Sequence, residues 1–161
     1  MPAFQHLRVL ILSKNFIDTI ENLDCLPNLD VLDLNDNRIL KIENLQGLDK
    51  LRILNLSSNL ITVLDVADSL KNLHELNLRK NFISEVKEIK QLTGLQRLYL
   101  SNNKITSLAQ VSNMPALSEI TLENNPIEKS ENLLKTLRIQ FPCLQYYNLQ
   151  KVSLLLSNLT T

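Results

Sequence analysis

The chain of 161 residues has little cysteine, glycine and histidine, no excess charge of either sign and no long apolar run. Its apolar residues recur in steps of two and three, far short of the roughly 20 consecutive apolar residues that span a bilayer. Lys and Arg together number 17, as do Asp and Glu, so the chain has no general attraction to nucleic acid or to an anionic membrane. We therefore expect neither a membrane protein nor a nucleic-acid-binding protein.

The scarce histidines and glycines also argue against catalysis. His6 and His74 are the only histidines, and no Cys, Asp or Glu stands at metal-ligand spacing from them. Neither Gly47 nor Gly94 belongs to a phosphate-binding run, and no nucleophile, base and oxyanion donor can be recognised together. We predict no enzyme activity, no cofactor and no small-molecule substrate.

One segment resembles the start of a calcium loop. Residues 33–37 read Asp-Leu-Asn-Asp-Asn, with oxygen ligands at alternate positions. However, Arg38 replaces the required glycine, Asn44 replaces the closing glutamate, and Asn37 belongs to a repeating column described below. The segment is therefore predicted to be a repeat turn, and no metal site is expected.

Leucine is abundant and recurs with a constant step of 22 residues. The first column of the repeat is Leu7, Leu29, Leu51, Leu73, Leu95 and Leu117. Three positions later stand Leu10, Leu32, Leu54, Leu76, Leu98 and Ile120, and two beyond those Leu12, Leu34, Leu56, Leu78, Leu100 and Leu122. This L-x-x-L-x-L spacing predicts one short strand with an apolar face in every repeat.

An asparagine follows each strand at the same place. The column is Asn15, Asn37, Asn59, Asn81, Asn103 and Asn125. A buried amide needs partners, and Asn can both donate to and accept from the backbone of the turn. We therefore predict that the six side chains stack as an amide ladder.

The full pattern, L-x-x-L-x-L-x-x-N-x-I-x-x-I-x-x-L, resembles the 22-residue leucine-rich repeats named after the yeast phosphatase regulator Sds22, over roughly His6 to Val152. The resemblance implies an α/β fold, a right-handed leucine-rich-repeat solenoid with a parallel sheet on the concave face and short helical or irregular segments on the convex face. We predict a single domain over residues 1–161, with six repeats at about 7–138, a C-terminal cap at about 126–152 and an apolar tail at 153–161.

The C-terminal cap has its own sequence signals. Ser130 is predicted to cap a helix that runs to about Gln140 and stops at Pro142. The final part resembles the terminal cap of this repeat class, except that Tyr147 and Asn148 stand where Leu-Asp is usual. We therefore expect the last turn of the cap to differ locally.

The N-terminal end has no comparable cap. Leu7 enters the first repeat almost at once, so Phe4 would have to cover the first apolar layer, and we expect the chain to be a piece of a longer protein. Cys25 and Cys143 fall on repeats on the order of 20 Å apart, too far for a disulfide. Free thiols and the lack of a secretory signal favour a cytoplasmic location.

The concave face is the predicted binding surface, because the residues flanking the middle leucine point away from the core. They form two columns: Val9, Val31, Ile53, Glu75, Arg97 and Glu119, and Ile11, Asp33, Asn55, Asn77, Tyr99 and Thr121. Arg79 lies on the rim beyond. An apolar strip in the first three repeats, rimmed by charge and Tyr99, is typical of a protein interface. The preference of β-branched residues for strands would also explain the strip.

A second candidate surface follows the asparagine column. Phe16, Leu60 and Phe82 occupy the position after the asparagine, where Arg38 and Lys104 stand in other repeats. These apolar side chains either form a lateral contact surface or shield the edge of the loops. We rank this surface below the concave face.

Several families share these repeats, and all imply binding to proteins. The runs 7–12, 29–34 and 117–122, followed by Asn125-Pro126-Ile127, look like the leucine-rich-repeat subunit of the tubulin polyglutamylase complex. That resemblance implies a scaffold in a microtubule-associated complex of the cytoskeleton, cilium or centrosome. The alternatives are a regulatory subunit of a protein phosphatase 1-type enzyme, and a relative of the spliceosomal U2 A-prime protein, which binds an RNA-binding partner.

Overall fold

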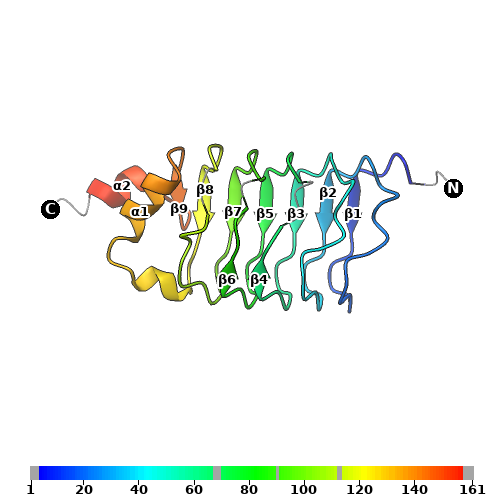
Figure 1. Ribbon diagram of the computed structural model, residues 1–161, viewed down its shortest axis with the longest axis horizontal. Coiled ribbons are helices and arrows are strands. Elements are labelled where there is room, and N and C mark those ends of the chain that lie inside the picture. The colour runs from blue at the N-terminus through cyan, green and yellow to red at the C-terminus, as the bar shows by residue number, and fades with distance from the viewer. Residues whose placement is uncertain (1–3, 67–69, 90, 112–113, 158–161) are drawn as a thin grey trace.

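The computed structural model describes residues 4–66, 70–89, 91–111 and 114–157, and within them the chain winds into a solenoid (Figure 1). Each repeat contributes one short strand to a sheet whose order is β1-β2-β3-β5-β7-β8-β9-β10. The six repeat strands are β1 Val9–Ile11, β2 Val31–Asp33, β3 Ile53–Asn55, β5 Glu75–Asn77, β7 Arg97–Tyr99 and β8 Glu119–Thr121. The predicted leucine-rich-repeat solenoid is confirmed.

The strands pair in parallel, in the register that the 22-residue step requires. Leu10 pairs with Leu32, and Leu32 with Leu54, so equivalent residues of successive repeats lie side by side. Further backbone bonds continue the pairing beyond the strands, as from Leu12 N to Asp33 O at 2.7 Å. Each column of the sequence is therefore a row of neighbours on the molecule.

The leucine columns form one continuous core. In the second to sixth repeats the strand leucines and their isoleucine equivalent are buried, for example Leu54 and Ile120. Leu7, Leu10 and Leu12 of the first repeat are only partly buried, and Phe4 is exposed instead of covering them. The first apolar layer is therefore open on one side.

The convex side takes the irregular form of the two that were predicted, short helical or irregular segments. Its described segments consist of turns and irregular backbone, with two short strands, β4 Val63–Leu64 and β6 Glu85–Val86, that pair in parallel. Gly47 has a φ of +85°, which suits a glycine in a tight turn. Gly94 has a different reason, because a Cβ there would lie 3.0 Å from the Lys71 carbonyl oxygen.

A left-handed residue stands immediately before every ladder asparagine. These residues have φ between 55° and 60° although none is glycine: Lys14, Asp36, Ser58, Lys80, Asn102 and Asn124. The left-handed conformation turns the chain out of the strand and into the loop. Asp and Asn tolerate it better than Lys or Ser, because their short polar side chains bond locally.

The C-terminal cap closes the last layer with helical segments and a hairpin (Figure 1). A 3-10 helix, η1 Pro126–Lys129, precedes α1 Leu133–Gln140, and the hairpin is β9 Tyr146–Tyr147 with β10 Gln150–Lys151. The prediction that Ser130 caps the long helix is wrong: Ser130 ends η1, and α1 starts three residues later, after Asn132. Pro142 lies just beyond the end of α1.

The last described residues are helical. Residues predicted as an apolar tail continue from β10 into α2, Val152–Ser157, and residues 158–161 lie outside the described part of the chain. Val152 is buried, and its backbone N–H donates to the Gln145 carbonyl at 2.9 Å. No helix in the described ranges has the length and apolar character needed to cross a membrane.

Candidate functional site

The ladder asparagines bind the backbone of their own repeat and of the one before. The Asn59 side chain accepts from the Ile39 N–H at 2.9 Å and donates to the carbonyls of Leu34 and Leu56 at 3.0 and 3.1 Å. The same arrangement recurs at Asn37, Asn81, Asn103 and Asn125, all of which are buried. Asn15, in the first repeat, is exposed and donates only to nearby carbonyls of its own turn.

The apolar strip of the concave face is open to solvent at its N-terminal end. Val9 is 50% exposed and Ile11 is 65% exposed. Val31 and Ile53 are half-buried and continue the row, because Val9 pairs with Val31 and Val31 with Ile53. These four side chains therefore form a contiguous apolar surface, which we call the concave strip.

Three polar residues of the second concave column end their strands instead of facing a partner freely. The side-chain oxygens of Asp33, Asn55 and Asn77 accept from the backbone N–H two residues later, at 2.9, 3.2 and 3.2 Å. Such local bonds are typical of Asn and Asp at turns. Each of these side chains therefore uses one oxygen to stabilise its own turn. The alternation of side chains along a strand does not predict such bonds.

The later repeats place paired charges around Tyr99. The Arg79 guanidinium carbon lies 4.1 Å from the centre of the Tyr99 ring, and Arg97 donates to a Glu75 carboxylate oxygen at 2.8 Å. Burial first, and then the carboxylates of Glu119 and Glu75, raise the pKa of Tyr99. This part of the face therefore combines one ion pair, between Arg97 and Glu75, with a phenol ring that Arg79 covers on one side.

The lateral column contains three apolar and two basic side chains, and each basic one lies over an aromatic ring. The Arg38 guanidinium lies 4.7 Å from the Phe16 ring centre, and the Lys104 ammonium lies 5.0 Å from that of Phe82. Phe16, Leu60 and Phe82 are exposed. Each cation lies over one aromatic ring, yet Phe16 remains 78% exposed, so this column stays the second candidate contact surface.

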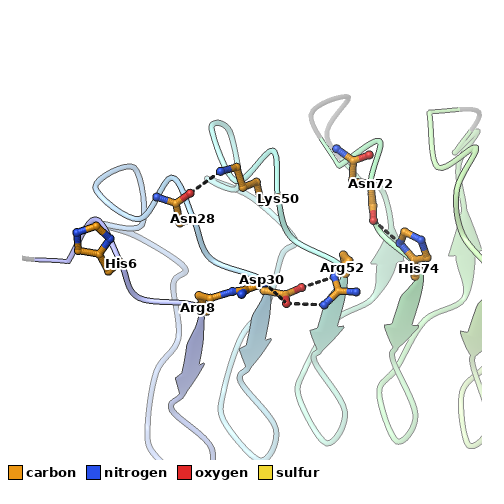
Figure 2. A pocket seen from close by; sticks show the side chains of 8 residues that line it. All are labelled: His6, Arg8, Asn28, Asp30, Lys50, Arg52, Asn72 and His74. Atoms are coloured by element: carbon orange, nitrogen blue, oxygen red, sulfur yellow. Dashed lines mark hydrogen bonds and ion pairs between the residues drawn. The ribbon is translucent and has the colours of Figure 1, made fainter.

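The structure also brings together a row of charged and polar side chains that was not predicted from the sequence. Figure 2 shows Arg8, Asp30, Arg52 and His74 in a row where the strands begin, beside a groove of about 610 Å³. Hydrogen bonds from Arg52 first, with the added charge of Arg8, lower the pKa of Asp30 despite its burial. The signal was available, because these residues also recur at the 22-residue step, directly before each strand.

The calcium-like segment of residues 33–37 is a repeat turn whose side chains bond the backbone. In the described ranges, no three His, Cys, Asp or Glu side chains lie together in a way that could hold a metal ion. In the calcium-like segment, Asp33 accepts from the Asn35 backbone and Asn37 is part of the ladder. Cys25 and Cys143 are exposed free thiols.

Comparisons with known proteins agree with this geometry. The family model described as leucine-rich repeats (two copies) matches residues 5–47, 49–91 and 93–135. No curated protein matches the chain. Solved structures do match it, and solenoids of this kind typically serve as protein-interaction modules through their extended concave surface.

Three solved structures illustrate the likeness. An internalin, InlF of Listeria monocytogenes, matches with a TM-score of 0.67 and 25% identity over 90% of this chain, which spans 47% of the internalin. A chain of the Drosophila melanogaster SNF/U2A′ complex matches with a TM-score of 0.62 and 24% identity, over 89% of this chain and 73% of that one. InlJ of Listeria monocytogenes matches with a TM-score of 0.67 and 21% identity, over 91% of this chain and 35% of the InlJ chain. With its repeats matched over most of its length, the chain belongs to the leucine-rich-repeat family.

Proposed function

We propose that this chain is a non-catalytic adaptor that binds a protein partner through the concave strip. The exposure of Val9 and Ile11 carries the proposal, because both are large apolar side chains that the fold does not bury. Val31 and Ile53 extend them into a contiguous surface. A partner that covers the strip removes apolar area from water, which is the main favourable term in protein association.

The remainder of the concave face would set orientation. Arg79 and Tyr99 stand beside the paired charges of Arg97 and Glu75, and arginine and tyrosine are enriched in protein interfaces. Glu119 completes this polar side. A partner would therefore meet an apolar surface in the first three repeats and a polar one in repeats four to six.

The test compares two glutamate substitutions at exposed isoleucines. Ile11 lies on the concave strip and is 65% exposed, whereas Ile139 lies on α1 of the cap and is 74% exposed. Tagged chains carrying Ile11→Glu or Ile139→Glu would be compared with wild type by crosslinking mass spectrometry in cell lysate. We expect Ile11→Glu to lose the crosslinks that map next to the strip and Ile139→Glu to keep them. Equal retention in both variants would refute binding at the strip.

The double variant Val31→Glu, Tyr99→Ala tests the whole face. Circular dichroism must first show that it folds, because both residues are only half exposed. We expect it to lose the same crosslinks as Ile11→Glu. If they persist, the lateral column of Phe16, Leu60 and Phe82 becomes the place to search.

For the assembly itself, the resemblance of residues 117–122 and of the Asn-Pro-Ile that follows supports a cytoplasmic scaffold in a microtubule or ciliary complex such as tubulin polyglutamylase. The alternatives remain a phosphatase 1 regulator of the Sds22 class and a relative of the U2 A-prime protein. The mostly aliphatic or neutral concave face counts against the phosphatase role. The identity of the crosslinked partners decides among the three.

A further inference from the structure

The groove at the start of the strands is lined by two rows of side chains (Figure 2). The inner row precedes strands β1, β2, β3 and β5 and consists of Arg8, Asp30, Arg52 and His74. The outer row consists of His6, Asn28, Lys50 and Asn72, one from each of the same repeats. The rows continue in the next two repeats as Gln96 and Ser118, and as Gly94 and Ala116, so the charge is confined to the first four repeats.

The groove carries more positive than negative charge. Among the described residues that line it, Asp30 is the one carboxylate, and it receives two hydrogen bonds from Arg52 at 2.5 Å each and one from Arg8 at 3.5 Å. Lys50 donates to the neutral amide of Asn28 at 2.5 Å and has no carboxylate within ion-pair distance in the described ranges. Arg8 and Arg52 thus share one carboxylate and Lys50 has none, whereas Arg97 and Lys87 elsewhere each pair with a carboxylate of their own.

The polar groups of the groove are already oriented. The His74 Nδ1 lies 2.6 Å from the Asn72 carbonyl oxygen, which can only accept, so Nδ1 carries the hydrogen and Nε2 is left for another partner. Asn72 is held in turn by the Asp49 carbonyl at 2.7 Å, and Asn28 by the Gln5 carbonyl at 2.5 Å. Groups fixed in this way lose little freedom when a ligand binds.

We propose that this groove binds an acidic segment of a protein through carboxylate or phosphate groups. Asp30 shows how an anion is held there, since its two oxygens receive the parallel N–H groups of Arg52. Arg8 is free to do the same for an incoming anion, because its side chain is 71% exposed and its contact with Asp30 is long. Lys50 supplies a second cation in the outer row.

The spacing suits an extended peptide. Neighbouring strands lie about 4.8 Å apart, so Arg8 and Arg52 begin about 10 Å from each other, and side chains on one side of an extended peptide repeat every 7 Å or so. A segment crossing the first three repeats can therefore place one acidic group near Arg8 and another near Lys50. Nucleic acid fits less well, because the lining residues that the structure describes include no Phe or Tyr for base stacking and the chain has zero net charge.

This binding site is independent of the concave strip, and its test uses the purified chain alone. The probes are short fluorescein-labelled peptides of equal length: alternating Asp and Glu, a single phosphoserine among Gly and Ser, and alternating Asn and Gln as the neutral control. Fluorescence anisotropy measures their affinity. We expect binding of one or both acidic probes and none of the neutral peptide, and their ranking tells carboxylate from phosphate as the preferred group.

Variants locate the binding. Arg8→Gln with Lys50→Gln should weaken the acidic peptide about tenfold or more, since two charge-assisted contacts are lost. The matched control, Lys129→Gln with Arg138→Gln, removes the same charges from exposed positions of the cap and should leave affinity within about twofold. Asp30→Asn should tighten binding about threefold, because it removes the competing carboxylate. A tighter complex cannot result from partial unfolding.

Three outcomes would overturn the proposal. Equal weakening by the groove and control variants would mean non-specific attraction to charge. Binding of the neutral peptide as tight as the acidic one would exclude anion recognition. Displacement of the acidic peptide by a short single-stranded RNA, with the same dependence on Arg8 and Lys50, would assign the groove to nucleic acid. Any of these outcomes would leave the proposed binding at the concave strip untested, because that proposal is tested by substitutions at other residues.

Discussion

Replacing Asn81 by Ala tests the energetic role of the amide ladder. The Asn81 side chain accepts from the Ile61 N–H at 3.0 Å and donates to the carbonyls of Leu56, Leu78 and Arg79 at 2.9, 3.1 and 3.4 Å. All of these groups lie next to a side chain that is 5% exposed, so water does not readily replace the lost bonds.

The magnitude follows from which groups keep a partner. The three carbonyls retain second donors, namely the amides of Asn59 and Asn103 and the Ser58 N–H, so their losses are small, about 0.5 kcal/mol each. The Ile61 N–H is left without its acceptor in a buried site, which costs about 1–3 kcal/mol. We therefore expect Asn81→Ala to lower the free energy of unfolding by about 3 kcal/mol.

Asn15 provides the matched control, because it has the same place in the repeat but is exposed and donates only to the carbonyls of Leu12 and Ser13. Asn15→Ala should cost less than about 1 kcal/mol. Urea denaturation followed by circular dichroism measures both, and with a slope of roughly 2 kcal/mol/M the Asn81 variant should unfold at about 1.5 M lower urea. Equal shifts in the two variants would refute the assignment of stability to the buried interior of the ladder.

Two other predictions concern the turns and the cap. Lys80 is exposed at a φ of 55°, so Lys80→Asn should raise the free energy of unfolding by about 0.5–1 kcal/mol, and an unchanged urea midpoint would contradict the cost assigned to that conformation. Burial and the nearby Glu128 raise the pKa of Tyr147 to about 12, against about 10 in an unfolded chain. The folded state therefore holds the Tyr147 proton to a higher pH than the unfolded chain does. The free energy of unfolding keeps its full value below about pH 10 and falls as the pH rises toward 12. The free energy of unfolding of Tyr147→Phe should therefore fall less than that of wild type between pH 9 and 11. Equal falls in the two proteins would argue against a raised pKa at Tyr147.

The solenoid could be predicted because a single repeat length determines its strand pairing. The step of 22 residues sets the register of every strand pair, and the apolar columns identify the side that packs inward. The failure at Ser130 has a local cause: Pro126 starts a 3-10 helix that ends at Lys129, so the residue that looked like a helix start became a helix end. Helix signals within a few residues of each other compete, and the sequence does not rank them.

The candidate surfaces were predictable only in part. Strand alternation correctly placed Val9 and Ile11 where they are exposed, since that rule depends on backbone geometry alone. It gave no warning that Asp33 would bond its own turn, because that depends on the path of the backbone after the strand. The basic groove was missed for another reason: Arg8 and Arg52 stand outside the strands, where no alternation rule applies.

The bonds of the ladder also bear on how such a chain can change in length. The bonds that a buried ladder amide makes beyond its own turn reach back 20 or 25 residues, always to the adjacent repeat. Duplication or deletion of one 22-residue unit in the interior therefore gives every remaining amide an equivalent neighbour. Such an event would lengthen or shorten the concave face by about 4.8 Å and leave the hydrogen bonding of the other repeats intact.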